Sequence, residues 1–314
     1  MRRTKTLKDP KLTVKLTERD RVMLRAVMEF RLVTNDQLAR ITGTQKTTLN
    51  KRILLLNQAD YLDRPDQGNR LFERDAERPV FNALGQRGAA ELVAEGVSFP
   101  EKKGWGFANR EISSKTWMTH QWGTVESYLI FRDVLSGAGL RQITRDELLD
   151  RASVAAKQLS DPWWFATRFV HPGTGITKRR GTRSDAQFAI GDSRTGGVER
   201  RMLQFLEFDN DTTPFVRSDP DQSSIAGLYL RYADMYQRQL HTERLGFKNF
   251  RVPIVVNAGW DRVHSMLGVF QKNAKHLLPA SVFLHTTFEE LKRHGPLAPI
   301  WLNGKGSSVL LIKE

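Results

Sequence analysis

The chain of 314 residues contains no cysteine, which excludes disulfide bridges and zinc sites built on cysteine. It also lacks any apolar run near the ~20 residues that a membrane-spanning helix needs. The basic N-terminal stretch has no apolar core of the kind found in a secretory signal, so we interpret it as a basic arm. These absences favour a soluble protein of a reducing compartment. We expect a cytoplasmic location without membrane contact.

Acidic residues are scarce relative to basic ones. Lys and Arg number 49 against 35 Asp and Glu, which gives a formal net charge of +14. Residues 1–60 hold 14 basic and 6 acidic side chains, so a surplus of eight charges lies in the first fifth of the chain. Such a balance indicates nucleic acid as the partner, with an anionic membrane as the weaker alternative.

The first hundred residues predict a winged helix-turn-helix domain. The Ser/Thr-x-x-acid pattern of Thr17 and Asp20 starts one helix, and apolar residues then recur at helical spacing. A second helix begins near Thr34 and a third occupies residues 44–64. Residues 61–93 then alternate as strand, turn, strand and helix. Three helices followed by a small hairpin are typical of this DNA-binding plan.

The third helix is expected to lie in the major groove of double-stranded DNA. Its short polar side chains would contact base edges, its cations would bind phosphates, and two arginines of the wing would reach the adjacent backbone. The alternative is an ordinary solvated, charged helix face. The residues predicted to bind DNA in this domain are Thr44, Gln45, Lys46, Thr47, Thr48, Asn50, Lys51, Arg52, Arg70 and Arg74.

Residues 97–115 are rich in Gly, Pro, Ser and charge, which predicts a linker between residues 1–96 and residues 116–314. The second part alternates in the order α-β-β-β-α-β-α-β, so we expect an α+β or mixed α/β domain with helices flanking its sheet. Two of its strands, "SDAQFAIGD" and "ERRMLQFLEFD", are separated by a short polar turn and predict a hairpin.

The N-terminal motifs resemble the opening of the replication-relaxation family, which is found on plasmids and other mobile elements. The matching segments are "LTERD" at residues 16–20, "DQLARITG" at residues 36–43 and "NALGQRG" at residues 82–88, the last without the family's threonine. Weaker matches continue at His120, at residues 184–186 and at Glu207-Phe208-Asp209. The resemblance implies a DNA-binding protein of a mobile element, acting in replication and relaxation or in transcriptional control.

The element order of residues 116–314 looks like the nuclease fold of restriction and Holliday-junction enzymes. That resemblance implies a helix acid, an Asp at the start of the second core strand and a Glu-x-Lys on the third, gathered around Mg²⁺ or Mn²⁺. The corresponding acids here are Glu126, Asp185 and Glu207, of which Asp185 and Glu207 would hold the metal. Asp209 stands where the lysine would be, two residues from Glu207 and on the same strand face.

The missing lysine decides how we interpret these acids. No lysine occurs between Lys178 and Lys248, and the arginines that follow, Arg231 and Arg238, hold their protons and are poor bases. We therefore expect a non-catalytic relic of a nuclease. The alternatives are a metal-dependent DNA endonuclease or nickase that uses these acids, Asp209 included, and a simple solvated strand end.

A second basic segment, "TKRRGTRSD", directly precedes the acids. We expect a loop that grips phosphate and draws DNA across the second domain, or alternatively a solvated loop. Its predicted DNA-binding residues are Lys178, Arg179, Arg180 and Arg183. Double-stranded DNA is thus the expected partner. A homodimer on paired half-sites and a protein partner for the second domain are further expectations.

Overall fold

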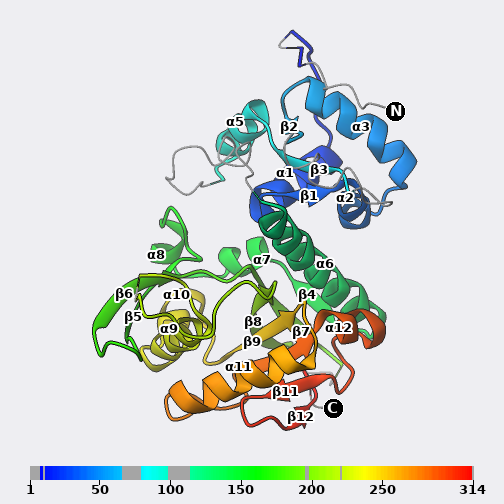
Figure 1. The fold of residues 1–314 in the computed structure, drawn as a ribbon. Coiled ribbons are helices and arrows are strands. Elements are labelled where there is room, and N and C mark those ends of the chain that lie inside the picture. Colours follow the sequence, from blue (N-terminus) through cyan, green and yellow to red (C-terminus); the bar gives the residue numbers. More distant parts are fainter. Residues whose placement is uncertain are drawn as a thin grey trace. The chain divides into compact units, whose positions relative to one another are not determined.

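The computed structural model describes residues 8–9, 11–65, 79–97, 114–194, 198–219 and 221–312. The chain divides into two compact units, Met1–Leu129 and Ile130–Glu314 (Figure 1). The division falls inside the long helix α6 (Lys115–Gly137). The sequence had placed a linker at residues 97–115, of which the structure describes only residues 97, 114 and 115. No helix of the described part is long and apolar enough to cross a bilayer.

The first unit contains the three helices that the sequence predicted, together with three short antiparallel strands, one of which lies between the first two helices. The Thr17–Asp20 capping box starts the first helix, a second box between Thr34 and Gln37 starts the next, and Gly43 ends that helix with a left-handed backbone. The strands pair in the order β1-β3-β2. The elements are α1 (Glu18–Phe30), β1 (Val33–Thr34), α2 (Asn35–Thr42), α3 (Lys46–Gln58), β2 (Leu62–Asp63), β3 (Phe81–Leu84) and α5 (Gln86–Ala94).

Four asparagines form a hydrogen-bonded chain inside this unit. Asn82 of β3 donates to Asn35 of α2 at 2.7 Å, and Asn35 donates to Asn50 of α3 at 2.6 Å. Asn57, also on α3, donates to the Asn82 oxygen at 3.3 Å. Asn82 and Asn57 are buried, and these bonds satisfy their amide N–H groups, although the Asn57 oxygen has no partner among the described residues. The bonds tie α2 and α3 to the sheet.

The second unit is built on a seven-stranded sheet in the order β12-β11-β10-β9-β8-β7-β4. β4, β7 and β8 are antiparallel neighbours, which confirms the predicted β7–β8 hairpin, and β8, β9 and β10 run parallel. The strands are β4 (Arg141–Ile143), β7 (Ala186–Asp192), β8 (Arg200–Asp209), β9 (Phe250–Val256), β10 (Phe283–Thr287), β11 (Trp301–Asn303) and β12 (Ser308–Val309).

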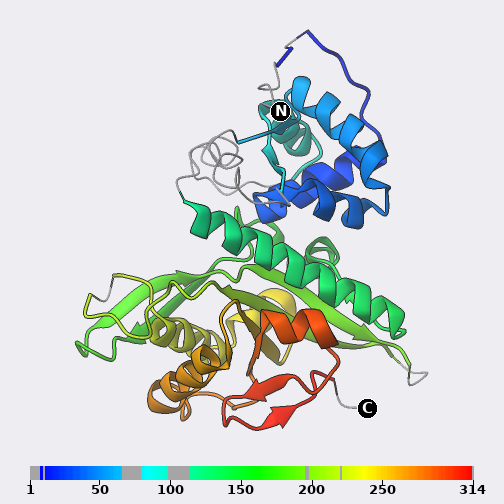
Figure 2. The same ribbon diagram turned by 45° about the vertical axis from the view of Figure 1, so that its right-hand side comes forward.

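Helices cover both faces of this sheet (Figures 1 and 2). The C-terminal part of α6 lies on one face, where Phe131 meets Phe188 of β7 with ring centroids 5.2 Å apart. Phe205 of β8 points to the other face and packs against Tyr232. The remaining helices are α7 (Arg145–Asp150), α8 (Val154–Lys157), α9 (Ile225–Gln237), α10 (Leu240–Leu245), α11 (Trp260–Asn273) and α12 (Phe288–His294). The mixed α/β architecture expected from the element order is thus present.

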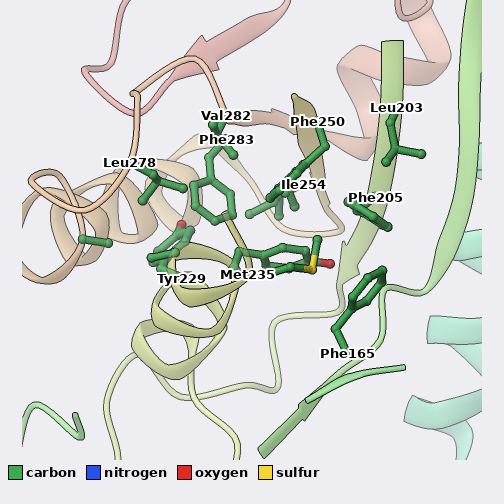
Figure 3. Close-up of a cluster of buried hydrophobic side chains, with 14 of the residues drawn as sticks. Phe165, Leu203, Phe205, Tyr229, Met235, Phe250, Ile254, Leu278, Val282 and Phe283 are labelled. Carbon is green, nitrogen blue, oxygen red and sulfur yellow. The ribbon is translucent and has the colours of Figure 1, made fainter. Parts of the chain in front are cut away.

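The core between the sheet and α9 is rich in aromatic rings (Figure 3). Phe205 meets Phe250 of β9 edge-on with centroids 5.2 Å apart, and Tyr229 of α9 meets Phe283 of β10 at 4.7 Å. Edge-to-face pairs of this kind add to the free energy of burying the rings. They fix α9 on the sheet, and α9 carries the side chains that meet the acidic end of β8.

The basic segment expected to be a loop is a strand. β6 (Thr177–Thr182) pairs with β5 (Phe165–Val170) in a separate two-stranded sheet. β6 contacts α9, and Thr182 is buried and hydrogen-bonded to Thr167 at 3.1 Å. The loop prediction was wrong. The charged side chains of the segment suggested a solvated loop, but a strand can carry such side chains on its outer face while its backbone groups hydrogen-bond to the neighbouring strand.

Candidate functional site

The first half of α3 presents polar and basic side chains to solvent. Gln45, Lys46, Thr47, Thr48 and Lys51 are exposed, and Leu49, Ile53 and Leu56 of the same helix are buried. The first turn holds no acidic residue. Lys46 lies 2.5 Å from Asp36, but both side chains are 58% exposed, so this pair is weak. The predicted DNA-binding helix therefore keeps most of its expected contact residues accessible.

Arg52 is a correction to that set. Its Nε and Nη2 donate to the two carboxylate oxygens of Asp20 at 2.9 and 2.6 Å, and Nη2 also donates to the Lys15 carbonyl at 2.8 Å. Burial of Asp20 opposes the shift, but hydrogen bonds from Arg52 and Thr17 outweigh it and lower the pKa of Asp20. The guanidinium thus binds inside the unit while its side chain stays 28% exposed, and its contact with phosphate stays a prediction.

Two other predicted residues also have internal partners. The Asn50 oxygen accepts from Asn35 at 2.6 Å, and the Thr44 hydroxyl donates to the Thr42 carbonyl at 3.3 Å. Arg70 and Arg74 lie outside the described residues. Fewer of the predicted DNA-contacting side chains around α3 are therefore without internal partners than the sequence suggested.

Glu126 belongs to the first unit and is engaged there. Arg40 of α2 forms an ion pair with its carboxylate, and the Gln37 amide nitrogen lies 3.5 Å from Oε2. Within the described ranges, no three His, Asp or Glu side chains are grouped so that they could hold a metal ion. Of the three acids expected to form a metal site, Glu126 thus belongs to the first unit and has partners there, whereas Asp185 and Glu207 belong to the second.

Asp185 and Glu207 do come together, at the adjoining ends of β7 and β8. The backbone N–H of Asp185 donates to Leu206 at 3.1 Å, and its carboxylate accepts from the backbone N–H of Phe208 at 2.8 Å. The Tyr232 hydroxyl of α9 donates to Glu207. Glu207 keeps some accessible surface, yet protein atoms surround it densely. Burial, followed by the charge of Asp185, raises the pKa of Glu207 well above its usual value.

Arg231 lies one residue before Tyr232 and within electrostatic reach of Glu207. Burial lowers the pKa of Arg231, and the charge of Glu207 opposes that shift. Its Nε and Nη1 are buried and have no hydrogen-bond partner among the described residues. A cation thus stands near the acids, but it is an arginine from the following helix rather than a lysine on the strand. Arginine stays protonated, so it can stabilise negative charge but does not act as a base.

Asp209 is a second correction, because an internal arginine binds it. Arg262 of α11 donates from Nε to one carboxylate oxygen at 2.9 Å and from Nη2 to the other at 3.2 Å. The same guanidinium lies 3.1 Å from Asp211 and stacks on the Phe215 ring. Nothing in the sequence near Arg262 pointed to this role. Of the alternating carboxylates at the end of β8, Glu207 therefore binds Tyr232, and Asp209 and Asp211 pair with Arg262.

The basic residues of the 178–183 segment divide between two faces of the β5–β6 sheet. Lys178 pairs with Asp221 at 2.9 Å, Arg180 donates to Ser223 at 3.1 Å, and Arg183 pairs with Asp161 at 3.1 Å. Arg179 is exposed and sits directly across the strand pair from Arg168. Three of the four predicted phosphate-binding residues are thus held by protein partners.

Comparison with known proteins identifies no relative: no family model, no curated protein and no solved structure matches the chain.

The raised pKa of Glu207 predicts a pH-dependent effect of Glu207→Gln. A carboxyl group whose pKa is higher in the folded than in the unfolded state contributes its full stabilisation of the fold below the unfolded pKa of about 4.3. That contribution is lost as the pH rises through the pKa of the folded state. Gln keeps an acceptor for Tyr232 but does not titrate. The melting temperature of the variant relative to the parent should therefore rise between pH 4.5 and pH 8 when followed by calorimetry.

The exposed Glu289 of α12 supplies the control, because Glu289→Gln removes the same charge without a buried environment. A Glu207→Gln difference that stays constant with pH, or that falls as the pH rises, would contradict the assignment of a destabilised buried carboxylate.

Proposed function

We propose that this chain is a double-stranded DNA-binding protein whose first unit is a winged helix-turn-helix domain. The order α1-β1-α2-α3-β2-β3, with strands paired β1-β3-β2, supports this proposal. In that plan the third helix enters the major groove and the second braces it. The observation that carries the proposal is the exposed, acid-free start of α3, with Lys46, Thr47, Thr48 and Lys51 turned to solvent.

The second unit is proposed to be a nuclease-like domain without catalytic activity. β4, β7 and β8 are antiparallel neighbours, and α9 leads from β8 to β9, which runs parallel to β8. The order on which the resemblance to restriction and Holliday-junction nucleases rests counted the strand at residues 163–170 as the first of three, whereas β5 pairs with β6 in a separate sheet. The internal partners of Glu126 and Asp209 favour a structural use of these acids. On the resemblance to the replication-relaxation family, we propose a role on a mobile element, in replication and relaxation or in transcriptional control.

Replacing Lys46 and Lys51 together with alanine should weaken duplex binding and reduce its salt dependence. Each lost phosphate contact lowers the slope of log affinity against log salt by about one unit. Fluorescence anisotropy with a labelled duplex at several KCl concentrations measures both quantities. Because Arg52 is bound to Asp20, it is left unchanged so that the fold is preserved.

A matched control is Lys272→Ala with Lys275→Ala, which removes two exposed lysines at the end of α11. Equal losses in both double variants would indicate only a general charge effect. An unchanged affinity and slope in the Lys46 and Lys51 variant would rule out α3 as the DNA-contacting helix.

A metal-dependent endonuclease or nickase is the second candidate, and the adjacency of Asp185 and Glu207 favours it. We expect no nicking when the full chain is incubated with supercoiled plasmid and Mg²⁺ or Mn²⁺. Metal-dependent nicking that is lost in Asp185→Ala and in Glu207→Ala, but kept in Glu289→Ala, would overturn the non-catalytic proposal. Agarose electrophoresis of the plasmid gives the readout.

A further inference from the structure

We infer that a cavity at the starts of β8 and β9 binds a small anionic molecule with a flat apolar body, the chemistry of a mononucleotide. The cavity encloses about 930 Å³ and lies wholly within Ile130–Glu314. Ligand sites in proteins commonly measure ~300–1,000 Å³, so the volume suits one small molecule. Arg201 and Met202 line it, at the opposite end of β8 from Glu207.

The charges around the cavity are strongly unbalanced. Four basic residues are among those that line it and Glu199 is the one acid, although the Arg251 guanidinium donates to the Leu311 carbonyl. The cationic residues are Arg151, Arg201, Lys248 and Arg251. Side chains of one sign that surround a concave site concentrate the electric field and attract ions of the opposite sign. The cavity therefore favours an anion.

Glu199 offsets one of these positive charges, because it pairs with Arg201 of the lining and with Arg141 outside it. Arg141 and Arg201 donate to it at 2.6 and 2.7 Å, and Arg151 lies 4.0 Å away. Hydrogen bonds from Arg141 and Arg201 lower the pKa of Glu199 to about 2. Lys248 is exposed and its ammonium has no ion-pair partner among the described residues. The lysine and the two guanidiniums beside Glu199 thus remain able to bind a phosphate.

The apolar side of the cavity is aromatic. Tyr236 and Phe247 are half-buried there, and the Tyr236 ring meets Phe250 edge-on at 5.7 Å. Figure 3 shows Phe250 and Val282, which belong to this side. A flat ring can stack against such walls, whereas inorganic phosphate alone would leave them unused.

The side-chain amide of Asn249, which lines the cavity, can hydrogen-bond to a polar ring. The Tyr236 hydroxyl donates to the Asn249 oxygen at 3.2 Å, and this bond does not use the Asn249 amide N–H groups. A base offers such acceptors on its edge. The cations, aromatic walls and amide together match the three parts of a nucleotide: phosphate, ring face and ring edge. This inference is independent of the DNA-binding proposal, since none of its residues lies in the first unit.

The test is isothermal titration of the full chain with AMP, adenosine and inorganic phosphate as separate probes, in metal-free buffer. AMP should bind, and adenosine and phosphate should each bind at least about tenfold more weakly, because each offers only part of the contacts. Lys248→Gln and Arg151→Gln should each weaken AMP by roughly tenfold, the loss of one charge-assisted contact. Ser281→Trp, at an exposed lining position, should abolish binding by filling the space.

Two controls keep the result specific. Lys275→Gln removes an exposed lysine outside the cavity, and the Lys46→Ala, Lys51→Ala variant removes the charges of α3; both should bind AMP as the parent does. No AMP binding at millimolar concentration would overturn the inference. Phosphate binding as tightly as AMP, or an equal loss in Lys275→Gln, would also overturn it. A failure of DNA binding by the α3 variant with AMP binding intact concerns only the proposed function.

Discussion

The bridge between Asp20 and Arg52 is the interaction on which the proposed DNA-binding surface depends. Asp20 is fully buried and completes the N-terminal capping box of α1, and Arg52 of α3 donates to both of its oxygens. Removing one partner of a buried pair costs ~3–5 kcal/mol, and the partial exposure of Arg52 reduces this to about 2–3 kcal/mol. The bridge fixes the rotation of α3, so that Leu49 points inward and Lys51 outward.

Ion pairs between an arginine and an acid of the same unit recur in the molecule, so its positive charge is not all available to a partner. Arginines neutralise Glu126 in the first unit and Asp209 and Glu199 in the second. Much of the arginine content therefore stabilises the fold. Among the described residues, Lys51 of α3 and Lys248 beside the cavity are exposed cations without an internal acid, and Lys272 and Lys275 are others. A net charge of +14 indicates an anionic partner, but the structure decides where that partner can bind.

Local features of the fold were predictable from sequence, and long-range pairings were not. The capping boxes, the β7–β8 hairpin and helix α9 each follow from patterns within a few residues. By contrast, the partners of Arg52, Asp209 and Glu126 lie 32, 53 and 86 residues away. No local pattern encodes such contacts. The sequence therefore identified the acids at 126, 185, 207 and 209 but did not predict which of them have internal partners. Strand β6 was missed because its charges dominate its pattern.

Site-specific photo-crosslinking tests most directly whether α3 is the surface that meets DNA. A benzophenone side chain is placed at the exposed Thr48, and in a matched protein at Val93 of α5, which is 59% exposed. Each protein is irradiated with a labelled duplex at low ionic strength. The account predicts crosslinks from position 48 that disappear at high salt and far fewer from position 93. Equal yields from the two positions, or none from position 48, would contradict it.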